Sequence, residues 1–253
     1  MGQMKIESNR DKLILAGLFL SKFDDEGLKT LGFAGFTEAF NAISIGLSSS
    51  PASLKNYRDE FDPYFPNPRK GWHKRSLRPY CRAIMEQFRG LDLDNFAELL
   101  KSQIYRLGEL ESFEEKLSSD VPGAFARRLI TGQAAEKYFE AVYTTASPFH
   151  SCRLENTTGL GCGFDFRLQP DSAPYYAVEV KGLASASGAI QMTDKEYKVA
   201  AWLKDRFFLF VVRNFAEKPF HTLFRDPIHS DLTLERRERV TVQVSWTASI
   251  GSA

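Results

Sequence analysis

The stretch of sequence that decides the fold is Tyr175-Tyr176-Ala177-Val178-Glu179-Val180-Lys181-Gly182. Its run of apolar residues predicts a β-strand. Because side chains on a strand point to alternate faces, we expect Glu179 and Lys181 to share one face while the valines pack on the other. Gly182 is expected to let the chain turn away after the strand. A carboxylate and an ammonium group side by side at the end of an apolar strand predict a concentrated polar site.

A second acidic residue stands a short distance before this strand. Asp165 is the single charge in Gly163-Phe164-Asp165-Phe166, and the apolar residues around it predict another strand. Residues 170–174 contain two prolines and predict the turn of a hairpin between the two strands. Pairing of these strands would bring Asp165 close to Glu179. An ordinary salt bridge between Glu179 and a neighbouring Lys or Arg is the alternative interpretation.

Two carboxylates placed in this way suit Mg²⁺, a hard cation that prefers oxygen ligands and keeps part of its water shell. A bound Mg²⁺ lowers the pKa of a water molecule and neutralises the charge that develops on a phosphodiester. Lys181 would orient the attacking water or stabilise the pentacovalent transition state. Asp165, Glu179 and Lys181 together therefore predict phosphodiester hydrolysis with Mg²⁺ as the cofactor.

The segments around these residues predict a mixed α/β core. Helices are expected over residues 124–143 and 194–204, and strands over 163–168, 175–180, 207–212 and 240–246. The run 207–212 is uninterruptedly apolar, which is typical of a buried strand. Glycines at 159, 161 and 163 precede a strand instead of following one, so they favour a turn beside Asp165 over a phosphate-binding loop.

These residues resemble the PD-(D/E)xK motif of restriction-endonuclease-like nucleases. The closer resemblance is to nuclease-like domains related to the C-terminal domain of the plant No Vein protein, which occur in bacterial restriction and defence proteins. It covers residues 126–215 and includes 132–136, 163–166, 178–182, 190–196 and 207–212. One departure is that Phe164 precedes Asp165 where the motif often has Pro. The resemblance implies metal binding by Asp165 and Glu179 and a catalytic role for Lys181.

The same resemblance implies supporting roles for residues outside the two strands. Glu136, on the first core helix, matches an acidic residue that supports the metal or its waters. Gln191 and Thr193 match the segment beyond the lysine and are expected to touch the scissile phosphate. Glu196 also matches, and its position on a predicted helix leaves a purely structural role open.

The first 120 residues read as helical, with helices expected over 13–23, 38–47, 52–61, 77–88 and 94–107. Thr37 and Ser50 are expected to cap the second and third of these helices. Residues 48–51 are Ser-Ser-Ser-Pro, a turn signal, so the two helices have the spacing of a helix-turn-helix unit. An ordinary helical hairpin is the alternative.

The second helix of this unit is expected to expose polar residues and to bury Leu54, Tyr57 and Phe61. The basic character continues beyond it, since residues 55–82 hold eight Lys or Arg against three acidic residues. We therefore expect this surface to bind double-stranded DNA. The residues expected to contact DNA are Lys55, Asn56, Arg58, Arg69, Lys70, Lys74 and Arg75.

Composition places the chain among ordinary globular proteins. It has 253 residues, of which 43% are hydrophobic and 26% are charged, and a net charge of +1. The sequence contains no run of about 18 apolar residues, so no transmembrane helix is expected. Three cysteines without a C-x-x-C pair favour neither a disulfide framework nor a zinc ribbon, and they suit a cytoplasmic location.

The sequence thus predicts an α+β or α/β fold. Residues 1–120 would form a helical, helix-turn-helix-like DNA-binding domain, and residues 121–253 a restriction-endonuclease-like domain with a mixed sheet. The predicted function is that of a Mg²⁺-dependent, Type II-like restriction endonuclease that cuts double-stranded DNA as a homodimer, because two strands need two active sites. The alternatives are a modification-dependent or partner-dependent defence nuclease and a non-catalytic DNA-binding regulator.

Overall fold

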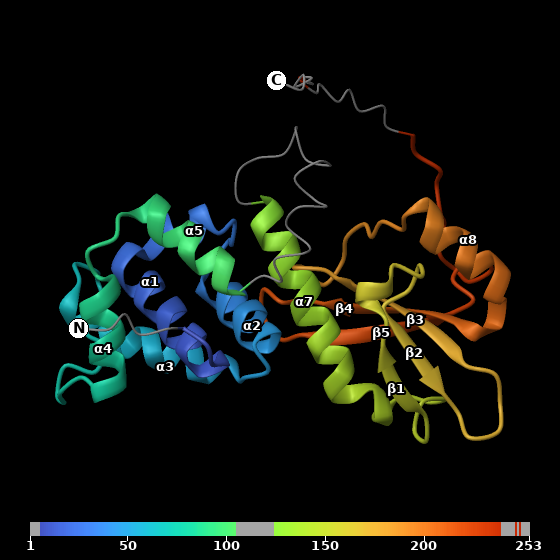
Figure 1. Cartoon of the computed structure of the whole chain (residues 1–253), viewed down its shortest axis with the longest axis horizontal. Helices are drawn as coiled ribbons and strands as arrows, with labels where there is room; N and C mark the ends of the chain where they lie inside the picture. Colours follow the sequence, from blue (N-terminus) through green and yellow to red (C-terminus); the bar gives the residue numbers. More distant parts are fainter. Residues whose placement is uncertain (1–5, 105–123, 239–245, 247, 249–253) are drawn as a thin grey trace, which may run out of the picture.

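The computed structural model of the chain describes residues 6–104, 124–238, 246 and 248. Figure 1 shows a helical half beside a half built on a β-sheet, with the long helix α7 (Ala124–Val142) between them. The predicted mixture of helices and strands is confirmed. The predicted domain boundary at residue 120 lies outside the described residues.

The helical half is organised around its first helix, α1 (Asn9–Thr30). The other elements of this half are α2 (Phe36–Gly46), α3 (Pro51–Phe61), the 3-10 turn η1 (Asp62–Tyr64), α4 (Pro79–Phe88) and α5 (Leu93–Ile104). Helices α3, α4 and α5 all pack against α1, and residues 13–20 of α1 are buried. This burial of a continuous apolar run explains why α1 is the central helix.

The turn between α2 and α3 forms as the sequence predicts. Ser50 caps α3 by accepting a hydrogen bond from the Ser53 N–H (3.3 Å), and Pro51 occupies the first turn. The predicted cap at Thr37 is wrong, because α2 begins at Phe36, two residues before the predicted start, and its N-cap residue Gly35 provides no side-chain cap. The carboxylate of Glu38 instead accepts a hydrogen bond from the Ala34 N–H (3.0 Å) and fixes the entry to α2.

The second half contains one five-stranded sheet in the order β1-β2-β3-β4-β5. After α7 the elements are η2 (Tyr143–Thr145), β1 (Arg153–Asn156), η3 (Thr158–Leu160), β2 (Phe166–Gln169), β3 (Tyr176–Gly182), α8 (Asp194–Leu203), η4 (Lys204–Arg206), β4 (Phe207–Arg213) and β5 (Phe220–Arg225). Strands β3 and β4 are parallel and are joined through α8, whereas the other pairs are antiparallel. The predicted hairpin of β2 and β3 is therefore confirmed.

The sequence analysis missed the two edge strands, β1 and β5. Three of the four residues of β1 are exposed, and β5 is only half-buried, so neither has the apolar run of an inner strand. The inner strand β4 is buried from Phe207 to Val212, as predicted. The strand predicted over 240–246 lies, apart from its last residue, outside the described residues.

The two faces of the sheet are covered by different helices. Helix α7 packs on the face that carries Val178 and Val180, and these residues belong to the main apolar core. Ala177 and Phe207 form a smaller cluster with Ala200 and other apolar residues of the α8 side. Because strand side chains alternate, Glu179 and Lys181 lie on the α8 side. The sheet therefore separates the charged residues of β3 from α7.

The prediction that Gly182 lets the chain turn away is wrong, because β3 continues through this residue. A Cβ atom at this position would lie 2.6 Å from the carbonyl oxygen of Thr131 on α7. The glycine is needed because the helix backbone approaches the strand too closely for a side chain.

The two halves share one continuous apolar core, which runs from α1 through α2 and α7 to the sheet. Polar contacts reinforce this junction. Asn41 on α2 donates hydrogen bonds to the carbonyl oxygens of Phe215 (2.7 Å) and Glu217 (2.8 Å), beyond β4. Glu38 on α2 pairs with Arg127 on α7 (2.6 Å). The orientation of the helical half relative to the sheet is thus fixed by packing and by buried hydrogen bonds.

Candidate active site

Asp165 lies directly before β2 and is held against β3 by two hydrogen bonds. Its N–H donates to the carbonyl oxygen of Val178 (3.0 Å), and its Oδ2 atom accepts from the N–H of Val180 (2.8 Å). The second bond sets the direction of the carboxylate. The predicted approach of Asp165 to Glu179 is confirmed, because Glu179 stands between these two valines on β3.

Glu179 and Lys181 share a face of β3, as the alternation of side chains predicts. The Lys181 ammonium donates to Oε1 of Glu179 and to Oε2 of Glu196 (2.8 Å). Glu196 lies in the first turn of α8, where it forms a capping box with Thr193: its carboxylate accepts from the Thr193 N–H (3.1 Å), and its N–H donates to the Thr193 hydroxyl (3.2 Å). The start of α8 is therefore bound directly to the charged end of β3.

The contact of Glu196 with Lys181 could not be predicted from the sequence. Helical periodicity alone places Glu196 on α8 without showing which strand residue it faces. The Thr193-x-x-Glu196 capping box was the available signal, since it fixes where α8 begins. Only the return of the chain over the sheet puts this carboxylate on the lysine.

The turn that carries Asp165 is held by α8 as well. Gly161 (φ +58°) and Gly163 (φ +94°) adopt left-handed conformations that favour glycine. A Cβ atom on Gly163 would lie 2.9 Å from a side-chain carbon of Val199, and the ammonium of Lys195 donates to the carbonyl oxygen of Gly161. The predicted glycine turn is confirmed, and α8 links it to β3.

The electrostatics of the site are dominated by an excess of carboxylates. Glu179 is only 4% exposed, and burial raises its pKa well above the ordinary value. The negative charges of Asp165 and Glu196 raise the pKa of Glu179 further, while Lys181 opposes them. Three carboxylates thus share one ammonium group, and the site favours an additional cation.

Lys181 is held in its charged form. Burial lowers the pKa of Lys181, but the charges of Glu179 and Glu196 outweigh this effect, so that its pKa lies above the ordinary value. An amine with a raised pKa keeps its proton at neutral pH. Lys181 is therefore suited to donate hydrogen bonds to a developing negative charge and is unsuited to accept a proton from water.

The donor atoms of the site fit Mg²⁺. The carboxylates of Asp165 and Glu179 supply the hard oxygen ligands that Mg²⁺ prefers. Among the residues that the structure describes, no three or more His, Cys, Asp or Glu side chains form a complete metal cage. Mg²⁺ does not require one, because it is commonly held by one or two carboxylates together with waters and substrate phosphates.

Two further predicted site residues, Gln191 and Glu136, lie outside β2 and β3. Gln191 is exposed in the segment before α8, two residues from the capping Thr193. Glu136 is on α7, across the sheet from Glu179 and Lys181, and its Oε2 atom is shielded from solvent. Roles for Gln191 in phosphate contact and for Glu136 in metal support stay predictions.

The comparison with known protein families bears on the sheet-bearing half. The family described as Protein NO VEIN, C-terminal, matches residues 134–224. This region is similar to the C-terminal domain of NO VEIN. The NO VEIN-like region includes β1 to β4, β5 except for its last residue, α8 and the cluster of Asp165, Glu179 and Lys181. No curated protein and no solved structure matches the chain.

None of the helices in the described part of the chain is both long enough and apolar enough to cross a lipid bilayer.

The predicted DNA-contacting residues lie outside the NO VEIN-like region, in the helical half. Lys55 and Asn56 are exposed on α3, as predicted. The prediction that Arg58 is exposed is wrong, because this residue is only 7% accessible. Its guanidinium lies over the rings of Phe36 (4.6 Å) and Phe40 (4.9 Å) and pairs with Asp59 (2.6 Å).

Arg58 is buried because α3 packs along α1 on this side. Asp62, four residues further on, is fully buried and lies 3.8 Å from the Arg58 guanidinium. The same carboxylate pairs with Arg69 (2.9 Å), which also pairs with Asp24 (2.5 Å). Arg58 and Arg69 therefore hold the loop after α3 onto the helices, and we assign them structural roles.

The other predicted DNA contacts remain at the surface. Lys70 and Lys74 are exposed, and the side chain of Arg75 is 49% exposed. Arg75 lies over the ring of Trp72, with its guanidinium carbon 4.0 Å from the ring centre. The predicted surface is thus smaller than the sequence suggested and is centred on the loop before α4.

Proposed function

We propose that this protein is a Mg²⁺-dependent endonuclease that hydrolyses phosphodiester bonds in double-stranded DNA, in the manner of a restriction enzyme. The observation that carries the proposal is the convergence of Asp165, Glu179 and Lys181 at β3. The resemblance to the PD-(D/E)xK motif and the match to the NO VEIN family support it. Because a duplex has two strands to cut, we propose a homodimer.

Each residue of the cluster has a distinct task in this reaction. Asp165 and Glu179 would hold Mg²⁺, which supplies a Lewis acid that offsets charge on the phosphate. The Val180 N–H keeps the Asp165 carboxylate in one orientation. Lys181, which stays protonated, would donate to a phosphate oxygen as negative charge builds up in the transition state. Glu196 positions the Lys181 ammonium for this task.

The proposal is tested by incubating the purified chain with unmethylated and methylated phage DNA, with Mg²⁺ or with EDTA. Discrete fragments from unmethylated DNA in Mg²⁺ alone are the expected result. Cutting of methylated DNA alone would replace the proposal with a modification-dependent nuclease. Retardation of DNA without any cutting would contradict the enzyme and favour a DNA-binding regulator.

Mg²⁺ is expected to raise the melting temperature more at a pH above the pKa of Glu179 in the metal-free protein than at a pH below it. Because the folded-state pKa of Glu179 is raised, the metal-free protein retains a proton on Glu179 at low pH and loses the associated stability as pH rises through that pKa. A bound cation must displace this proton at low pH but meets an ionised carboxylate at high pH. Thermal unfolding with and without Mg²⁺ at both pH values measures the difference.

The matched variant for this measurement is Glu179→Gln, which removes the titrating group and keeps the side-chain size. Its Mg²⁺-dependent shift should be small and should not change with pH. Equal shifts of the unmodified protein at the two pH values would contradict the assignment of Glu179 as a ligand.

A further inference from the structure

Three arginines and two aromatic rings alternate at the outer end of the helical half. The guanidinium carbon of Arg10 lies 3.9 Å from the ring centre of Tyr80, and that of Arg78 lies 5.0 Å from the same ring. Arg78 is also 5.6 Å from the ring of Trp72, on which Arg75 lies at 4.0 Å. We call the series Arg10, Tyr80, Arg78, Trp72 and Arg75 the arginine–aromatic stack.

A buried carboxylate holds the centre of this stack. Glu60 on α3 is 3% exposed and accepts hydrogen bonds from the N–H (2.8 Å) and the Nε atom (2.6 Å) of Arg78. Its Oε2 atom also lies 3.5 Å from Arg75. Because one carboxylate faces two guanidinium groups, and Arg10 adds a third at the far end of the series, the stack carries an excess of positive charge.

The loop that carries Trp72 and Arg75 is fixed by its backbone. Gly71 has a φ of +51°, and a Cβ atom there would lie 2.3 Å from the carbonyl oxygen of Asp59. The Trp72 N–H donates to that same oxygen (2.8 Å). The loop therefore holds its cations in a fixed geometry, which reduces the entropic cost of ordering the loop when a ligand binds.

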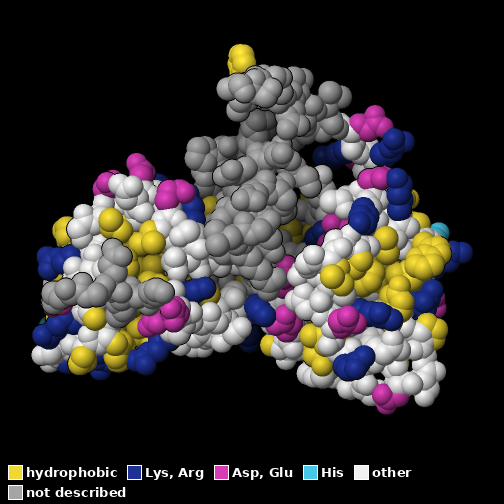
Figure 2. Space-filling model, viewed as in Figure 1, with side chains coloured by type: hydrophobic (Ala, Val, Ile, Leu, Met, Phe, Trp, Pro, Cys, Tyr) yellow, Lys and Arg dark blue, Asp and Glu magenta, His cyan; other side chains and the backbone are white. Residues whose placement is uncertain are grey.

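The cations of the stack face outward. Arg10 is exposed, as are Lys70 and Lys74 on the same loop as Trp72, and the side chain of Arg75 is half exposed. Figure 2 shows Lys and Arg side chains at the outer end of the helical half, where Figure 1 places α3 and α4. This end of the molecule thus has the charge of a surface that binds an extended polyanion.

We propose that the arginine–aromatic stack binds the phosphate backbone of double-stranded DNA. Planar guanidinium groups donate paired hydrogen bonds to phosphate oxygens, and stacking on a ring leaves their N–H edges available. Each ring of the stack already has two guanidinium carbons within 5.6 Å of its centre, and these cations compete with a base for the ring. The contacts are therefore to phosphates and not to bases.

This arrangement determines which nucleic acid fits and what it contributes. Proteins that bind single strands offer aromatic faces to unstacked bases, whereas the rings of the stack are engaged by guanidinium groups. A duplex has the higher density of phosphate charge. The stack is thus an anchor that binds DNA independently of its sequence. The choice of DNA as the polyanion rests on the proposed function.

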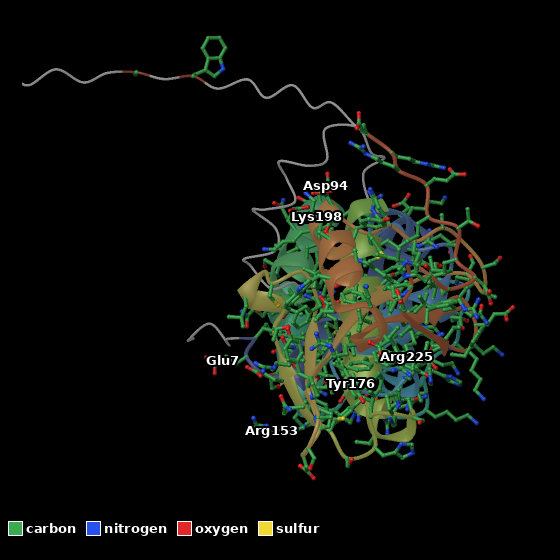
Figure 3. The ribbon with its side chains drawn as sticks, turned by 90° about the vertical axis from the view of Figure 1, so that its right-hand side faces the viewer. Glu7, Asp94, Arg153, Tyr176, Lys198 and Arg225 are labelled. Atoms are coloured by element: carbon green, nitrogen blue, oxygen red, sulfur yellow. The ribbon has the colours of Figure 1, made fainter. Side chains whose placement is uncertain are left out.

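The test compares two double variants in a Glu179→Gln background, with EDTA present so that DNA stays intact. The first variant, Arg10→Ala with Arg75→Ala, removes the two outer guanidinium groups and leaves the pairing of Glu60 with Arg78. The second, Lys198→Ala with Arg225→Ala, removes two exposed cations from α8 and from the end of β5, in the sheet-bearing half; Figure 3 labels both residues. Thermal unfolding establishes that both variants are folded.

Binding of a duplex oligonucleotide is measured over a range of salt concentrations. We expect the stack variant to bind about tenfold more weakly at low salt and to have a log–log salt slope shallower by about two, since each lost phosphate contact contributes about 0.9. The α8–β5 variant should match the background protein. A stack variant that binds as the background does, or equal losses in both variants, would overturn the proposal, as would tighter binding of a single strand than of the duplex.

The outcomes also separate this proposal from the proposed function. If DNA binding depends on the stack but the protein with intact Asp165, Glu179 and Lys181 never cuts DNA, the nuclease proposal fails and the anchor stands. If the protein cuts DNA and the stack variant binds normally, the anchor fails and the nuclease stands.

Discussion

Replacing Lys181 with alanine is expected to lower the rate of DNA cleavage by about a thousandfold while DNA binding is retained. The reason is that Lys181 is the cation on the α8 side of β3 between Glu179 and Glu196, and its raised pKa keeps it charged in the transition state. Removal of one preorganised donor to a developing charge commonly costs about a hundredfold to a thousandfold. Single-turnover cleavage at saturating Mg²⁺ measures the chemical step directly.

Two further variants make this result interpretable. Lys198→Ala on α8 removes an exposed lysine that pairs with Asp194 at the surface, and its cleavage rate should be unchanged. Asp165→Asn keeps an oxygen that can accept from the Val180 N–H but removes the charge, so it should lose cleavage as Lys181→Ala does. Full activity in Lys181→Ala or Asp165→Asn would refute the assignment of the site.

Replacing Asp62 with alanine should lower the free energy of unfolding by about 3 kcal/mol, because removing one partner of a buried ion pair leaves uncompensated charge. The Asp62 side chain is fully buried and accepts hydrogen bonds from Ser21 (2.8 Å) and from Arg69 (2.9 and 3.1 Å). Loss of the Asp62 carboxylate would leave the positive charges of Arg58 and Arg69 only partly compensated. Urea denaturation followed by circular dichroism gives the difference.

The control for this prediction is Asp205→Ala. Asp205 pairs with Arg225 at 2.9 Å, but both side chains are more than half exposed, so their attraction is screened by water and salt. Its loss should change the free energy of unfolding by less than about 1 kcal/mol. Similar losses in the two variants would mean that Asp62 is not the anchor of the loop after α3.

The Asp62 cluster and the candidate active site illustrate two uses of buried carboxylates. Asp62 and Glu60 are each matched by arginines, and both serve to hold a loop. Glu179 faces more negative than positive charge, and burial makes that imbalance costly. This imbalance distinguishes Glu179 from the two carboxylates that hold loops, and it suits a site that takes up a cation.

Much of the fold followed from local sequence patterns. The apolar run of β4, the alternation along β3 and the cap at Ser50 each depend on residues close together in the chain, and each was predicted. The edge strands β1 and β5 were missed because a strand exposed on one side carries no continuous apolar run. Arg58 was assigned to the surface because helical periodicity does not show that a carboxylate four residues away will be buried with it.

The sequence by itself determined the chemistry available to this protein: which carboxylates and which lysine stand on the β2–β3 hairpin, and which segment is basic. The tertiary structure alone decided how these groups are used. It brought Glu196 of α8 to Lys181, buried Arg58, paired Arg69 with Asp62, and placed Arg10 on the ring of Tyr80 in one series with Trp72 and Arg75. The physical reason is that burial and charge pairing depend on neighbours distant in the chain, and these neighbours are set only when helices pack on the sheet and on one another.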